Sequence, residues 1–293
     1  MLVVDVLERM GGVATRGALI RATSRAAVDA ALGAGELVVL ARGRYALAST
    51  DEALQVAHRL TGVASHESAA LLHSWAVLHA PQQPHVTVPR KRHLAEQVNA
   101  SVHYADLSDD DCDGSVTSQE RTLVDCLRLA DRSAALAVAD SALREGFSRT
   151  RLLAIARDLR GPRSAQARAV AEAADARAAN PFESALRAIA GEVVGLEVVP
   201  QGSLRDGNRF LGRPDLVDER LGIVLEADSF EWHGGRHALT RDARRYNQLV
   251  VHGWLVLRFS WEDVMFHPRE VMSVLEAAVV EKAQRCACGR RRV

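Results

Sequence analysis

The sequence predicts a multidomain protein of mixed α/β (α+β) class. Three observations lead to this prediction. Short amphipathic helical patterns followed by strand-like runs open the chain, alternating strands and alanine-rich helices fill its middle, and apolar runs bounded by polar residues return at 221–225 and 254–257. A chain of 293 residues exceeds the usual length of one domain, so it can form two or three hydrophobic cores.

The composition gives no whole-chain argument for binding nucleic acid, because 37 basic residues balance 37 acidic ones. Any DNA-binding surface must therefore be local. The four cysteines follow neither a paired zinc pattern nor a disulfide framework. The chain shows no charged and apolar leader at its start, and no apolar run reaches the ~18 residues of a membrane span. We expect a reduced, cytoplasmic protein with no membrane partner.

Residues 1–50 have the pattern of a winged helix-turn-helix domain. An amphipathic helix is predicted over 2–10, Thr15 is a plausible N-cap for a helix over 16–22, and Thr23 or Ser24 caps a third over 25–33. Two strands, 36–40 and 44–47, follow as a hairpin. The third helix of such a domain enters the major groove of double-stranded DNA. The candidate DNA contacts are Arg16, Arg25, Arg42 and Arg44. The alternative is a domain of this shape that contacts only protein.

Residues 51–161 are predicted to form an α/β region. A helix is expected over 67–77, strands over 85–88 and 102–107, and helices over 134–145 and 149–159. Thr117 and Glu120 have the spacing of a capping box that opens a helix to 129. Residues 162–180 are predicted to be a helical linker. Residues 1–161 resemble the AbiEi-type antitoxin family in the winged-helix pattern and in three motifs, at 65–70, 85–89 and 116–125. The resemblance implies transcriptional regulation by the first domain and a cognate toxin protein as partner.

The stretch 212–263 carries the residues that point to chemistry. Asp215 and Glu226 are expected at neighbouring strand ends, where two carboxylates can share one Mg²⁺ (or Mn²⁺) ion. A helix is predicted over 239–251, and it places Arg241 and Arg245 one turn apart on the same side, where both could grip phosphate.

Residues 181–282 resemble the PD-(D/E)xK nuclease fold, and within it the very-short-patch-repair (Vsr) endonuclease group. The matching residues are Pro181 to Arg187 with Glu183, Arg213-Pro214-Asp215, Glu226-Ala227-Asp228, Phe230, Trp232-His233, Arg241-Asp242, Arg245, Gly253-Trp254 and Arg258. The resemblance implies a mixed sheet flanked by helices, a metal-dependent endonuclease activity, and catalytic roles for Glu183, Asp215, Glu226, Asp228 and His233. Residues 283–293 are predicted to be a basic tail.

One feature departs from the nuclease pattern. The usual motif has lysine two residues after the second acid, and this chain has Asp228 there. In the Vsr-like pattern His233 could act as general base instead, and Asp228 could bind metal. Two hypotheses follow. The chain is a metal-dependent DNA endonuclease, or it is a non-enzymatic, AbiEi-like regulator in which a degenerate nuclease fold only binds.

Overall fold

The computed structural model describes residues 2–94, 98–228 and 236–289, and within the last range the side chains of 243–284. The chain divides into two compact units, Met1–Arg128 and Leu129–Val293. Both contain helices and strands, which confirms the predicted mixed α/β class. The domain boundary expected at 161–180 falls inside the second unit.

The first unit opens with helices packed on a small antiparallel sheet of order β1-β3-β2. Hydroxyl caps start its second and third helices, because Thr15 Oγ1 accepts from Ala18 N and Ser24 Oγ accepts from Ala27 N. Leu7, Leu19 and Val28 are fully shielded from solvent in its core. The helices predicted over 16–22 and 25–33 are confirmed. The elements are α1 (Val3–Arg9), β1 (Val13–Thr15), α2 (Arg16–Ala22), α3 (Arg25–Gly33), β2 (Val38–Ala41) and β3 (Arg44–Ala46).

The rest of the first unit is built on a mixed sheet of order β6-β5-β4-β8-β7. The residue that caps the helix after β8 differs from the prediction. Ser118, not Thr117, caps α6 by accepting from Arg121 N, and Thr117 is buried, with its hydroxyl hydrogen-bonded to that of Thr122. The elements are α4 (Glu52–Leu60), β4 (Val63–Ala64), α5 (His66–Leu72), β5 (His85–Val88), β6 (Ser101–Tyr104), the short 3-10 helix η1 (Asp109–Asp111), β7 (Cys112–Asp113), β8 (Val116–Thr117) and α6 (Gln119–Cys126).

The second unit begins with helices α7 (Arg132–Arg144), α8 (Arg149–Asp158), α9 (Ser164–Ala173) and α10 (Pro181–Ala190). Asp140 on α7 is only 1% exposed in its side chain and forms a buried ion pair with Arg187 on α10. Its carboxylate also accepts hydrogen bonds from Ser184 Oγ at 2.7 Å and from Asp175 N at 2.7 Å. The expected linker is therefore joined tightly to α10.

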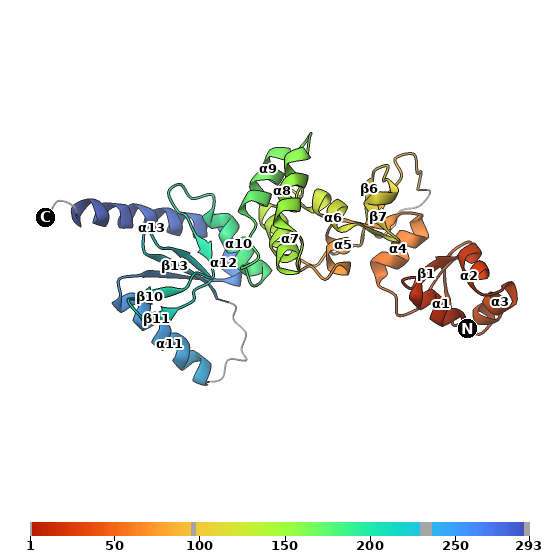
Figure 1. The fold of residues 1–293 in the computed structure, drawn as a ribbon, viewed down its shortest axis with the longest axis horizontal. Coiled ribbons are helices and arrows are strands. Elements are labelled where there is room, and N and C mark those ends of the chain that lie inside the picture. Colours follow the sequence, from red (N-terminus) through yellow and green to blue (C-terminus); the bar gives the residue numbers. More distant parts are fainter. Residues whose placement is uncertain (1, 95–97, 229–235, 290–293) are drawn as a thin grey trace. The chain divides into compact units, whose positions relative to one another are not determined.

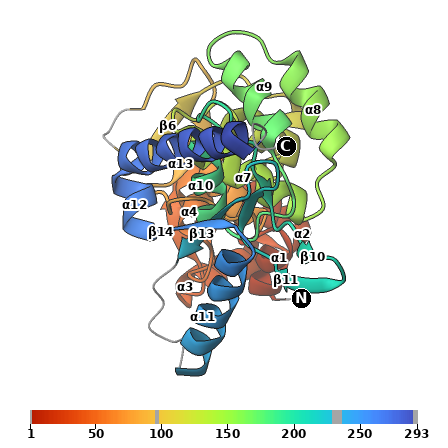
Figure 2. The same ribbon diagram turned by 90° about the vertical axis from the view of Figure 1, so that its left-hand side faces the viewer.

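The remaining strands form a sheet of order β14-β13-β12-β9, in which β13 pairs parallel with β14 and antiparallel with β12. A hairpin of β10 and β11 packs Leu204 and Leu211 with Leu249 of α11. Helices α13 and α11 lie on opposite sides of the sheet (Figures 1 and 2). The elements are β9 (Val199–Pro200), β10 (Leu204–Asp206), β11 (Arg209–Gly212), β12 (Leu216–Asp218), β13 (Ile223–Asp228), α11 (Arg236–Val251), β14 (Leu255–Ser260), α12 (Trp261–Phe266) and α13 (Pro268–Gly289).

The last helix, α13, continues through Gly289 into the stretch expected to be a basic tail. Among the described residues, none of the helices combines the length and the apolar character that a membrane crossing requires.

Candidate active site

The two predicted metal ligands lie side by side on adjacent strands. Leu216 on β12 pairs with Leu225 on β13, so the antiparallel register places Asp215, one residue earlier, beside Glu226, one residue later. Ala227 N donates to Asp215 Oδ2 at 2.9 Å, which fixes the orientation of that carboxylate. Asp215 and Glu226 thus lie at neighbouring strand ends, as expected. Glu226 is not at the surface, since it is only 3% exposed.

Glu183 reaches the same place from α10. Its helix starts with Asn180 as N-cap and Pro181 in the first turn, which the sequence pattern favours. Asn180 Nδ2 donates to Glu183 Oε1 at 2.9 Å, and Ala179 N donates to Oε2 at 3.0 Å. Glu183 is therefore held rigidly and buried, facing the edge of the sheet where Asp215 lies.

Gln201 links these acids, and no motif in the sequence identifies it. Its Nε2 donates to Glu183 Oε2 at 3.0 Å and to Asp215 Oδ1 at 3.3 Å. Pro200 on β9 pairs with Leu216, so Gln201 follows in the same register beside Asp215. Its backbone is in the left-handed region, with φ of 54°, which is uncommon for a residue other than glycine.

Burial raises the pKa of all three acids, Glu226, Asp215 and Glu183. Burial raises the pKa of Glu226 to about 7, the nearby charge of Asp215 contributes to this, and Arg245 opposes it. Glu226 Oε1 is shielded from solvent and accepts no hydrogen bond from the part of the chain that the structure describes. Buried polar atoms nearly always have hydrogen-bond partners, and this oxygen has instead the positive charge of Arg245 at 3.4 Å, which shows that the position suits a cation.

Arg245 is the predicted phosphate-binding residue that the structure places at the site. Its Nη2 lies 3.4 Å from Glu226 Oε1 and 3.3 Å from the hydroxyl of Tyr246, a residue that the sequence analysis did not single out. The Tyr246 ring also lies under the guanidinium of Arg258, at 4.3 Å from the ring centroid. The acids thus face a group of arginines stacked on one aromatic ring.

Asp228, at the position of the usual lysine, is ion-paired with Arg258 and is 40% exposed. Lys282, the lysine of the second unit, does not take over that position, because it donates to the carbonyl of Gly253 at 3.0 Å, beside Gly222 at the opposite end of β13. Among the described residues, the oxygens of Glu183, Asp215 and Glu226 do not all lie within 4.8 Å of one another, so at most two of them can share one ion in this conformation.

The candidate DNA contacts of the first unit have different surroundings. Arg25 and Arg42 are exposed, on α3 and in the turn between β2 and β3. Arg16 is instead engaged within the domain, by an ion pair with Asp29 and a hydrogen bond of 3.1 Å to the Tyr45 hydroxyl. Arg44 is half-buried, with Nη1 at 3.4 Å from Nδ1 of His58.

Two predicted residues cannot be placed at the site. His233 lies outside the described residues. Arg241 belongs to α11, but its side chain is also outside the described part.

The second unit thus brings Glu183, Asp215 and Glu226 together beside Arg245. A comparison with known proteins finds a partial sequence similarity. The chain is 24% identical over 101 residues to the Type II nicking enzyme V.HpaIIP of Haemophilus parainfluenzae. This match covers 28% of this chain and 72% of the relative. No known protein-family profile matches the chain. The similarity is distant and partial, and it points to a relationship with DNA-cleaving nucleases.

Proposed function

We propose that this protein is a Vsr-like, metal-dependent endonuclease that hydrolyses phosphodiester bonds of double-stranded DNA. The observation that carries the proposal is the buried carboxylate of Glu226 beside that of Asp215. Its Oε1 accepts no hydrogen bond from the described residues and is ion-paired with Arg245 at 3.4 Å. The partial similarity to a nicking enzyme supports the same reaction class. Since its substrate would be the DNA of the cell, the proposal also places the protein in the cytoplasm.

Asp215 and Glu226 fit a Mg²⁺ (or Mn²⁺) ion, because hard cations take oxygen ligands and need only one or two protein carboxylates. Such an ion, when bound, would stabilise the charge that develops on the phosphate and lower the pKa of a bound water. Glu183, held by Asn180 and Gln201, would position a water molecule or support a second ion.

The arginines and the predicted base complete the proposed roles. Arg245, and Arg241 one helical turn earlier, would hold the phosphate on either side of the bond to be broken. His233 would take the proton from the attacking water. Asp228 would act through Arg258, whose guanidinium it binds, rather than as the motif lysine does.

DNA docking is proposed for the first unit through the N-terminal domain, with the helix-and-hairpin order of a winged helix. Arg25 on α3 and Arg42 in the hairpin turn are exposed and can reach DNA. Arg16 and Arg44, which have partners within the unit, would have to exchange them for phosphate.

The test is a cleavage assay on plasmid and mismatched duplex DNA with Mg²⁺ or Mn²⁺. The wild type should cleave, and Asp215→Asn and Glu226→Gln should each lower the rate by at least about 100-fold while leaving duplex binding unchanged. Glu219→Gln is the matched control, because it removes one carboxylate from an exposed turn of the same domain. Equal cleavage by Asp215→Asn and wild type would refute the site.

A second candidate function has one specific observation in its favour. The ion pair of Asp228 with Arg258 occupies the position of the catalytic lysine, as expected if the nuclease fold were kept only for binding. In that case the chain would be an AbiEi-like transcriptional regulator with a toxin protein as partner. Retained duplex binding with no cleavage under any metal would support it over the nuclease.

A further inference from the structure

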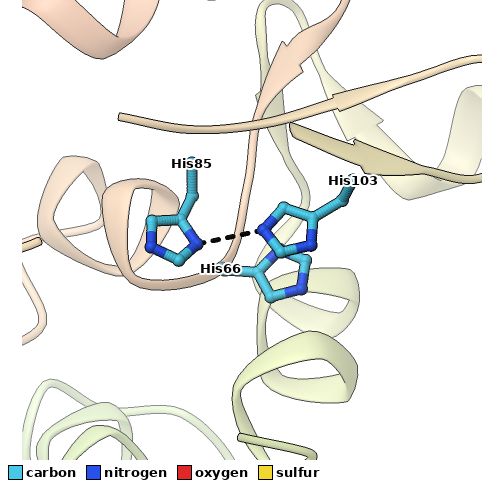
Figure 3. A group of neighbouring side chains, drawn as sticks. All are labelled: His66, His85 and His103. Carbon is cyan, nitrogen blue, oxygen red and sulfur yellow. Dashed lines mark hydrogen bonds between the residues drawn. The ribbon is translucent and has the colours of Figure 1, made fainter. Parts of the chain in front are cut away.

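Three histidines of the first unit, distant in the sequence, meet at one place. His66 begins α5, His85 begins β5, and His103 lies on β6. The parallel pairing of β5 with β6 sets Thr87 opposite His103, and His85 projects to the same face as Thr87 because side chains alternate along a strand. Figure 3 shows the three rings converging. None of these residues takes part in the proposed nuclease site.

The ring nitrogens are close enough to share an ion. His85 Nδ1 lies 3.0 Å from His103 Nε2, and the His66 ring stacks on His103 with centroids 3.6 Å apart. One nitrogen from each ring lies within 4.8 Å of the others, which holds for no other group of three candidate ligands in the described residues.

We propose that His66, His85 and His103 form a binding site for a transition-metal ion, Zn²⁺ by ligand type, with a water molecule as fourth ligand. Imidazole suits zinc, and zinc sites with three protein ligands keep a fourth position open. Around a tetrahedral ion with Zn–N bonds of ~2.0 Å, nitrogens lie about 3.3 Å apart, so His66 has to approach by at most about 1.5 Å. To do so, its ring must turn off the face of His103.

Carboxylates stand behind two of the rings. Glu67 Oε2 lies 3.9 Å from His85 Nε2, the nitrogen that points away from His103. His66 Nδ1 lies 3.1 Å from Ser65 Oγ and 4.0 Å from Asp125 Oδ2, which itself binds Arg121, and this leaves Nε2 of the His66 ring for the ion. Metal-binding histidines usually present their second nitrogen to such a carboxylate, which orients the ring and raises its basicity. Both carboxylates lie beyond hydrogen-bond distance in this conformation, and Glu67 would have to approach by about 1 Å to act as such an outer partner of His85.

The scaffold around the rings is fixed before any ion binds. Ser68 Oγ accepts from His85 N at 2.9 Å, and Ser65 N donates to the His85 carbonyl at 3.0 Å. Thr87 Oγ1 donates to Ser65 Oγ at 2.8 Å. These bonds attach the start of α5 to β5, so the relative position of the first two ligands is set by the fold.

The charge state of the rings agrees with this geometry. Burial lowers the pKa of His66 to about 2, with further lowering by His103 and His85. Burial lowers the pKa of His103 to about 4. At neutral pH both imidazoles carry a free lone pair, which is the form that binds metal.

The experiment is a calorimetric titration of Zn²⁺ into the EDTA-treated full chain that carries Asp215→Asn and Glu226→Gln, so that the nuclease acids do not contribute. One equivalent should bind. His103→Ala should weaken binding by at least about 100-fold, and Glu67→Gln by about 10- to 100-fold. His79→Ala, which removes an exposed histidine of the same unit, should bind as the parent does.

Co²⁺ provides an independent readout that does not depend on whether a variant folds. Bound at the cluster it should give the intense visible absorption of a tetrahedral ion, and Zn²⁺ should displace it. A parent protein that binds no Zn²⁺, or that binds it equally well with His103→Ala, would overturn the proposal. A weak octahedral Co²⁺ spectrum would also overturn it, because it would mean that the three imidazoles do not converge on the ion.

Discussion

Replacing Glu226 by glutamine should stabilise the second unit in the absence of divalent metal, although it should lower the cleavage rate by at least about 100-fold. Glu226 is 3% exposed, and its Oε1 accepts no hydrogen bond within the described residues. A buried carboxylate that serves as a metal ligand destabilises the folded state when the metal is absent, whereas a carboxylate that forms a structural ion pair stabilises it. The effect of Glu226→Gln on stability therefore shows whether the carboxylate is a metal ligand or a structural partner of Arg245.

The magnitude follows from the pKa of Glu226, which rises from an ordinary value of 4.5 to about 7. Between these pH values the folded protein keeps a proton that the unfolded chain has lost, so the free energy of unfolding falls as pH rises. The loss is about 1.4 kcal/mol per pH unit and reaches roughly 3 kcal/mol above pH 7. Glutamine has no charge to bury and escapes this loss. For a unit of this size, the gain corresponds to a rise of roughly 6 to 12 °C in Tm.

The assay is scanning calorimetry of the full chain with EDTA at pH 5 and pH 8.5. Glu226→Gln should melt higher than wild type at pH 8.5 and close to it at pH 5, and Glu219→Gln should match wild type at both. Adding Mg²⁺ or Mn²⁺ at 100 times its Kd should stabilise wild type by about 2.7 kcal/mol and leave Glu226→Gln unchanged. If Glu226→Gln melts lower than wild type at pH 8.5, the carboxylate is a structural partner of Arg245 and our assignment fails.

Three further predictions concern other parts of the chain. Asp140→Ala should destabilise the second unit by about 3 to 5 kcal/mol, because it leaves Arg187 buried without its partner, whereas Asp158→Ala at an exposed position should change the calorimetric Tm little. Arg42→Ala should weaken binding to all duplexes about equally and reduce the salt slope of log K by about 1, and an unchanged slope would show that this arginine does not meet phosphate. In the metal-free protein, burial and the neighbouring His103, His85 and Arg121 lower the pKa of His66 from 6.5 to about 2. As pH drops from 6 to 4, His66 should therefore lower the stability of the first unit by about 1.4 kcal/mol per pH unit, and denaturation of His66→Phe should show a slope smaller by that amount.

The sequence predicts best where one local pattern determines the result. Thr15 and Ser24 mark helix starts by hydroxyl caps, and the helices at 16–22 and 25–33 have the predicted bounds. At 117–120 two hydroxyls adjoin, and pattern alone cannot tell which one caps. Burial decides it, because Thr117 bonds Thr122 inside the unit and Ser118 is left to cap α6.

The candidate site was predictable only in part, because its residues form one row across the sheet. Asp215 and Glu226 could be placed together since their strands follow each other closely in the chain. The same row continues to Gln201 on one side and, through the pairing of Glu226 with Arg258, to β14 on the other. Those extensions depend on strand order, β14-β13-β12-β9, which no local pattern specifies.

The histidine cluster shows the same limit more strongly. His66 and His85 lie in motifs that the antitoxin-like resemblance singled out, yet nothing in their spacing brings in His103. His103 reaches the cluster because β5 and β6 pair in parallel. Parallel strands are joined by a long connection, so no tight turn in the sequence determines their register. A one-residue slip of β6 would turn His103 to the other face and leave two ligands. Metal binding at this cluster would therefore depend on the β5–β6 register as well as on the three side chains.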